Sequence, residues 1–222
     1  MSDPRERLTR LVELATQNAP DERRLLATEL CDLLLDWPAN YPPAMREPFE
    51  TLLEKTMRLI DRETRVRLIG RIAHAGAAPL AFVSEYFFDA PCELRAAILA
   101  RSAQASQAAQ CRRFDEASLI GRARAASRDA FADALAQALD LSPETAARIL
   151  RDGSAQALAV AAKGAHLSRA TFSALALLAD GAGPVDETLA RLAAYDGVPQ
   201  DSAEGMLAFW QGRGTNSDAR AA

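Results

Sequence analysis

The chain has 222 residues, a formal net charge of −4 and a hydrophobic fraction of 49%. These values are typical of a soluble globular protein and exclude disorder as the default state. Aromatic residues make up only 6% of the chain and alanine is abundant, which favours helix over sheet because alanine loses least on entering a helix.

The first hundred residues read as helices joined in pairs. Apolar residues recur at helical spacing in six stretches: ERLTRLVELAT, DERRLLATELCDLLLD, FETLLEKTMRLI, DRETRVRLIGRIA, PLAFVSEYFF and CELRAAILARSA. The proline-rich stretch WPANYPPAMREP separates the first pair from the second, because proline cannot continue a helix. We therefore predict helical hairpins over residues 1–100.

The second helices of these pairs resemble one another. Arg24, Arg67 and Arg95 each stand three residues before a small or aliphatic residue that would share the same helical face. An arginine near the start of the second helix is a feature of HEAT-like repeats, and residues 1–100 look like two to three divergent pairs of this kind. The competing interpretation is that any amphipathic hairpin in an arginine-rich protein shows the same spacing.

Residues 101–127 are expected to form an arginine-rich connector or weak helix. The segment from Arg101 to Arg128 holds six arginines against Asp115 and Glu116, a local charge of +4. A basic segment can contact a phosphate backbone. The candidate phosphate-binding residues are Arg112, Arg113, Arg122, Arg124 and Arg128.

Residues 128–212 are predicted to form three further hairpins of about 26 to 31 residues, a length at which stacked helical hairpins share one core. Ser142 and Ser168 suit N-cap positions and Pro143 suits the first helical position. Three glycines can take the left-handed conformation that ends a helix: Gly153, Gly181 and Gly212. The expected fold is all-α, with hairpins stacked into an α-solenoid (a HEAT/ARM-like superhelix). Residues 213–222 lack a large apolar side chain and are expected to be a disordered tail.

The stretch FADALAQALDLSPETAARILRDGSAQALAVAAKGAHLSRATFSALALL, residues 131–178, carries a family resemblance. It resembles the C-terminal part of an uncharacterised alphaproteobacterial helical-repeat family, domain-of-unknown-function family 2336. The resemblance implies the helical fold and brings no established catalytic residues.

No catalytic or metal-binding pattern emerges. His74 and His166 each lie near the end of an apolar helix without a carboxylate three or four residues away, and phosphate-binding glycine loops are absent from the sequence. Cys31, Cys92 and Cys111 have no metal-ligand spacing and are interpreted as small buried thiols. We expect no cofactor, no metal and no enzymatic activity.

A surplus of aromatic residues marks a candidate interface. Phe82 and Tyr86 would lie one turn apart on one helix face while Phe87 and Phe88 point elsewhere, so a single buried stripe does not hold all four. Core packing is the first interpretation of such a cluster, and a partner-binding patch is the second. The full set of candidate interface residues is Trp37, Tyr41, Arg67, Phe82, Tyr86, Phe87, Phe88 and Arg95.

These features favour a non-enzymatic protein-binding scaffold or adaptor with an unidentified protein partner or a second copy of itself. The alternatives are a nucleic-acid-binding protein that uses the Arg101–Arg128 segment, or an enzyme whose carboxylates or histidines converge in space. The acidic sequence pI of about 5.3 weighs against nucleic acid. The charged N-terminal stretch and the absence of a membrane-spanning apolar run predict a cytoplasmic protein.

Overall fold

The structure is a computed structural model that describes residues 4–16, 19–38, 41–75, 80–103, 115–125, 127–180 and 183–212. Within these ranges it contains 13 α-helices, two short 3-10 helices and no strand, which confirms the all-helical prediction. The described residues fall into two compact units, one up to Leu94 and one from Arg95 onward. The division predicted at residues 100 and 127 stays a prediction.

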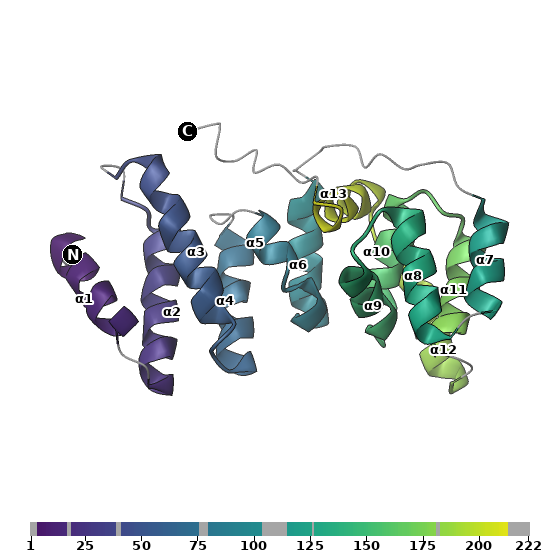
Figure 1. Ribbon diagram of the computed structural model, residues 1–222, viewed down its shortest axis with the longest axis horizontal. Coiled ribbons are helices and arrows are strands. Elements are labelled where there is room, and N and C mark those ends of the chain that lie inside the picture. Colours follow the sequence, from purple (N-terminus) through teal and green to yellow (C-terminus); the bar gives the residue numbers. More distant parts are fainter. Residues whose placement is uncertain are drawn as a thin grey trace. The chain divides into compact units, whose positions relative to one another are not determined.

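The first unit holds the first five α-helices and both 3-10 helices (Figure 1). The α-helices are α1 (Pro4–Thr16), α2 (Pro20–Leu35), α3 (Arg46–Met57), α4 (Arg62–Ala75) and α5 (Leu80–Ser84), and the 3-10 helices are η1 (Pro43–Met45) and η2 (Phe87–Asp89). Helix α2 packs against α1, α3 and α4. Its leucines at 26, 30, 33 and 34 are buried, so α2 supplies much of the core of this unit.

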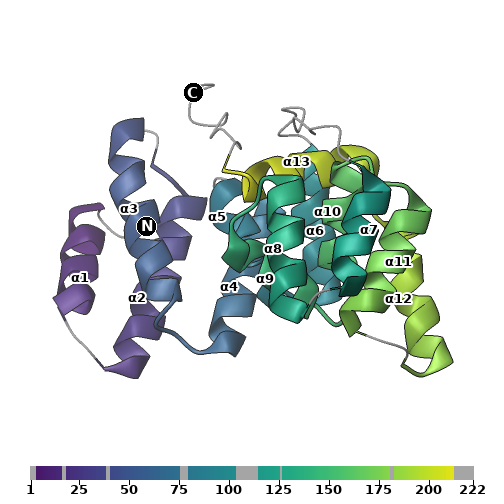
Figure 2. The ribbon, with the colours of Figure 1, turned by 45° about the vertical axis from the view of Figure 1, so that its right-hand side comes forward.

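The boundary between the units falls within α6 (Cys92–Ser102). The second unit continues with α7 (Glu116–Ala125), α8 (Arg128–Leu139), α9 (Pro143–Arg151), α10 (Gln156–Gly164), α11 (Arg169–Asp180), α12 (Val185–Gly197) and α13 (Gln200–Trp210). Helix α10 is buried on nearly every side and contacts α9, α11, α12 and α13 (Figure 2). A helix that is apolar all round belongs in the centre of a bundle, and α10 takes that place here.

Glycines allow two close helix contacts with α13. A Cβ built on Gly164 of α10 would lie 2.5 Å from the Ala203 carbonyl oxygen, and one built on Gly205 of α13 would overlap the Ser102 carbonyl oxygen. The Ser102 hydroxyl also donates to the Ser202 carbonyl at 2.7 Å. Helix α13 therefore joins the end of α6 to the central helix α10.

Helix starts follow the local signals in the sequence. The Ser142 hydroxyl accepts from Thr145 N at 3.1 Å with Pro143 in the first turn, and the Ser168 hydroxyl accepts from Thr171 N at 3.2 Å. Both serines were predicted as N-caps, and the structure confirms them. A serine at this position satisfies a backbone N–H that has no partner inside the helix.

Helix ends agree less well with prediction. Gly212 is left-handed with φ +71°, as expected, but Gly153 is not, and Gly181 lies outside the described residues. Near Gly153 the left-handed residue is Ala155, with φ 55°. The predicted tail, residues 213–222, also lies outside the described residues.

Candidate functional site

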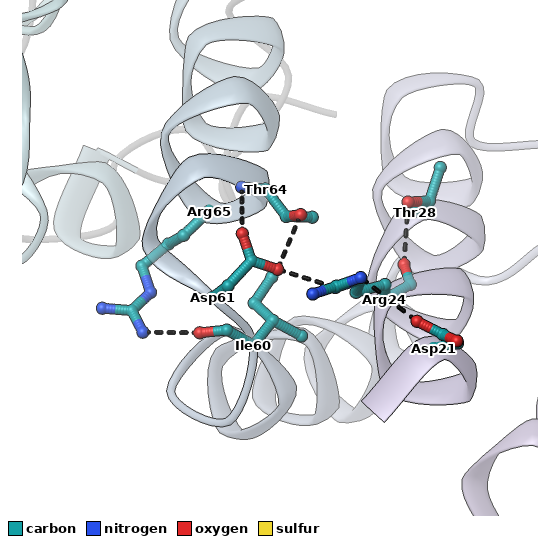
Figure 3. A network of polar contacts seen from close by, with 7 residues as sticks. All are labelled: Asp21, Arg24, Thr28, Ile60, Asp61, Thr64 and Arg65. Carbon is teal, nitrogen blue, oxygen red and sulfur yellow. Dashed lines mark hydrogen bonds and ion pairs between the residues drawn. The ribbon is translucent and has the colours of Figure 1, made fainter. Parts of the chain in front are cut away.

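Arg24, first noted as a repeat-like arginine, holds two helices of the first unit together (Figure 3). Its Nε donates to Asp61 Oδ2 at 2.7 Å, which joins α2 to the start of α4. Asp61 also accepts from the Thr64 backbone N–H and hydroxyl, both at 2.9 Å, and so acts as the N-cap of α4. These bonds, chiefly the two from Thr64 and then those from Arg24, lower the pKa of Asp61 from 3.8 to about 2.

The lowered pKa predicts a pH dependence that can be measured. A carboxyl whose pKa is lower in the folded than in the unfolded chain stabilises the fold above pH 4, and this contribution disappears as pH falls from about 4 to 2. We expect Asp61→Asn to destabilise the first unit at pH 6 and the gap to wild type to narrow below pH 4. Urea unfolding of both proteins at pH 6 and pH 2.5 tests this; an equal gap at both pH values contradicts it.

Arg95 forms an ion pair with Asp152 in the second unit, which resembles the Arg24–Asp61 pair but is buried. Its side chain is 9% exposed and the side chain of Asp152 is 7% exposed. Arg95 Nη1 lies 2.9 Å from both Asp152 oxygens and 3.0 Å from the Ser154 hydroxyl. Asp152 also accepts from Ala157 N at 2.8 Å and so holds the start of α10. The Arg95 side chain is therefore buried in this unit and does not offer an exposed charge for a partner.

The four aromatic residues of the predicted interface differ in burial. Tyr86 and Phe87 are buried, with 5% and 0% of their surface exposed, while Phe82 and Phe88 are half-buried. The prediction assumed one continuous helix, but α5 ends at Ser84 and the chain turns into η2. This change of direction carries Tyr86 and Phe87 into the core, where burial raises the pKa of Tyr86 to about 12. Only Phe82 and Phe88 still offer partial surface.

The second predicted aromatic pair lies at the join between α2 and α3. Trp37 and Tyr41 are half-buried and meet edge to face with ring centroids 5.7 Å apart. The Trp37 and Phe49 ring centroids are 5.8 Å apart, and the Arg46 guanidinium lies 6.0 Å from the Trp37 ring centroid. These contacts pack Trp37, just beyond the end of α2, against Arg46 and Phe49 of α3. Arg67, the remaining candidate, is exposed on α4.

The alternative phosphate-binding arginines are brought together only in part. Arg112 and Arg113 lie outside the described residues. Arg122 is exposed and its Nη2 donates to Gln137 of α8 at 2.9 Å. Arg124 and Arg128 are exposed near the α7–α8 connection.

Two further arginines near this connection were missed from the sequence. Arg128 Nη2 donates to the Leu150 carbonyl at 2.7 Å, so the end of α9 lies next to the start of α8. The last turn of α9 carries Arg148 and Arg151. Their spacing of three residues in an amphipathic helix was the signal that could have drawn attention to them.

The two histidines have different surroundings. His74 is exposed and its Nδ1 lies 2.7 Å from the Gly70 carbonyl oxygen. His166 is left-handed, with φ 56°, and its Nε2 lies 3.4 Å from Glu204. This carboxylate is far away in sequence, so the pair was invisible to a search for local spacing. Among the described residues, no three histidine, cysteine or acidic side chains are grouped to hold a metal ion.

The cysteines agree with prediction in one case. Cys31 is buried, and burial raises its pKa to about 11, as expected of an inert thiol. Cys92, the first residue of α6, is exposed, contrary to the prediction. Cys111 lies outside the described residues.

The sequence reasoning also missed an apolar face on α12. Val185 is 72% exposed and Leu189 is 59% exposed, and no residue of this helix is fully buried. The two side chains are one turn apart on the same face. On α11 the neighbouring Leu177 and Leu178 are 42% and 37% exposed. The exposure of Val185 and Leu189 becomes visible only in the folded chain.

Comparison with known proteins identifies a family. A family described as "Uncharacterised protein conserved in bacteria (DUF2336)" matches residues 50–208, which include α4 to α12 and nearly all of α13. No curated protein and no solved structure matches the chain. Across the part of the chain that the structure describes, every helix is too short or too polar to cross a membrane.

Proposed function

The chain belongs to the DUF2336 family of uncharacterised bacterial proteins, and we propose that it is a protein-interaction module that binds its partner through α12. The proposal includes the stacking of its hairpins as a HEAT-like α-solenoid, a cytoplasmic location and the absence of enzymatic activity. Solenoids of helical hairpins present extended binding surfaces, which suits this role.

The exposed apolar face of α12 is the observation that carries the proposal. Helix α12 contacts α10 and α11, with half-buried residues such as Leu192 and Tyr195. Val185, Leu189 and Ala193 follow one another at four-residue spacing and are exposed. A helix at the surface of a protein normally turns a polar face to water. An apolar stripe at this position supports packing against a further helix.

Charge indicates which kind of helix fits. Asp186 and Glu187 are exposed in the first turn of α12, beside Val185. A partner helix with an apolar stripe would cover Val185 and Leu189, and basic residues flanking that stripe would face the two carboxylates. The favoured partner is therefore a protein with a basic amphipathic helix.

The proposal predicts that Val185→Ser with Leu189→Ser weakens partner binding by about tenfold or more, as expected for central apolar contacts. The fold should be unchanged because both side chains are exposed. The measurement is quantitative mass spectrometry of proteins retained from a native bacterial extract by the immobilised chain. Val12→Ser with Leu25→Ser is the matched control, since these residues are also exposed and apolar but lie on α1 and α2. Equal retention of the same proteins by both double variants contradicts the proposal.

A further inference from the structure

Four arginines gather where α9 ends beside the connection between α7 and α8. Arg124 lies in the last turn of α7, Arg128 is the first residue of α8, and Arg148 and Arg151 lie in the last turn of α9. The bond from Arg128 to the Leu150 carbonyl, 2.7 Å long, holds the start of α8 beside the end of α9. The end of α7 is separated from the start of α8 by only two residues along the chain. We call these four arginines the arginine edge.

The arginine edge is a concentration of positive charge at the surface of an acidic protein. Arg124, Arg128 and Arg151 are exposed and Arg148 is half-buried. Asp129, in the first turn of α8, is an exposed carboxylate at the same place. The nearby carboxylate of Asp152 is buried against Arg95. Positive charge therefore exceeds negative charge at this edge, although the whole chain carries −4.

Part of this positive charge has an ordinary structural use. Arginines in the last turn of a helix complement its dipole, and Arg151 Nε donates to the Ala147 carbonyl at 3.1 Å. This bond uses one of the five N–H donors of a guanidinium group. The arginine edge combines the arginines of two helix ends and one helix start. Together they form a surface for a ligand with several acidic groups.

We propose that the arginine edge docks an acidic segment of a partner protein. Arginine presents a planar pair of N–H donors that matches a carboxylate, which favours it over lysine at such a surface. Neighbouring helices lie about 8–10 Å apart, so the edge suits an extended segment of about four to six residues. This surface is distinct from the apolar face of α12, and either can fail without the other.

A protein segment fits the edge better than a nucleic acid does. Single-stranded nucleic acids bind through aromatic side chains that stack on bases as well as through positive charge. Phe131, the aromatic residue of α8, is only 2% exposed and offers no ring for stacking. The negative charge of the whole chain also repels a long polyanion more than a short acidic segment.

The test is direct binding to the full chain, measured by fluorescence anisotropy at low ionic strength. The probes are a labelled peptide with six consecutive aspartate and glutamate residues, the same peptide with asparagine and glutamine, and a labelled single-stranded DNA of twelve nucleotides. The proposal predicts binding of the acidic peptide only, with affinity falling as salt is added.

Arg124→Gln with Arg151→Gln should weaken binding of the acidic peptide about tenfold or more. Arg10→Gln with Arg62→Gln removes the same charge from exposed positions on α1 and α4 and should leave binding unchanged within about twofold. Circular dichroism confirms that both variants fold. No binding of the acidic peptide, equal weakening by both double variants, or tighter binding of the DNA than of the peptide would each overturn the proposal.

Discussion

Replacing Asp152 with alanine is expected to lower the free energy of unfolding of the second unit by about 3–5 kcal/mol, because it removes the carboxylate that is paired with the buried Arg95 guanidinium. The Arg95 and Asp152 side chains are 9% and 7% exposed, so water solvates the remaining Arg95 guanidinium poorly. The same change removes the acceptor for Ala157 N at the start of α10, the central helix of this unit. Urea unfolding followed by circular dichroism measures the loss.

Two further variants show whether the loss of stability in Asp152→Ala comes from the buried charge of Arg95 or from the loss of any carboxylate. Asp196→Ala breaks an ion pair with Arg169 whose side chains are more than half exposed, and it should change stability far less. Adding Arg95→Met to Asp152→Ala should recover part of the loss, because it removes the buried positive charge. If the double variant is no more stable than Asp152→Ala, the burial of Arg95 is not the cause.

Gly205→Ala is expected to destabilise the second unit by about 1–3 kcal/mol, although alanine is the better helix former. The added Cβ would overlap the Ser102 carbonyl oxygen, which belongs to the backbone of α6 and has little freedom to move. Helix α13 must then shift away from the end of α6. Thermal and urea unfolding both report this change.

Gly121→Ala provides the control within the same unit. A Cβ at Gly121, in α7, meets no atom within 4 Å. The substitution should therefore raise the free energy of unfolding by up to about 1 kcal/mol through helix propensity alone. Opposite signs for the two glycines are the expected outcome. Stabilisation by Gly205→Ala would contradict the close packing of α13 against α6.

The features that could be predicted from the sequence are those decided within a few residues. Helical periodicity predicted the all-helical fold, and Ser142 with Pro143 predicted the start of α9, because a cap and its N–H partner lie within one turn. The end of α5 at Ser84 could not be predicted in this way. Tyr86 and Phe87 are compatible with a continuing helix. Their burial in the core depends on contacts outside this segment, and the local sequence does not show those contacts.

The candidate sites depended more heavily on distant contacts. Arg95 was noted from its position in a helix, but its partner Asp152 lies 57 residues away, so its burial could not be predicted. The arginine edge exists because the end of α9 lies beside the start of α8, and no local spacing relates Arg151 to Arg128. The exposed stripe of α12 reads in the sequence like any core-facing stripe. Only the packing shows that Val185 and Leu189 remain at the surface.

Site-specific photo-crosslinking in living bacterial cells tests the central claim most directly. A photoreactive phenylalanine analogue replaces Leu189 in one variant and Val12 in the other, both exposed apolar positions. The account predicts a discrete adduct of higher mass from position 189 that disappears when Asp186 and Glu187 are changed to lysine, and no matching adduct from position 12. The same adducts from both positions, or none from position 189, would contradict binding of a protein partner through α12.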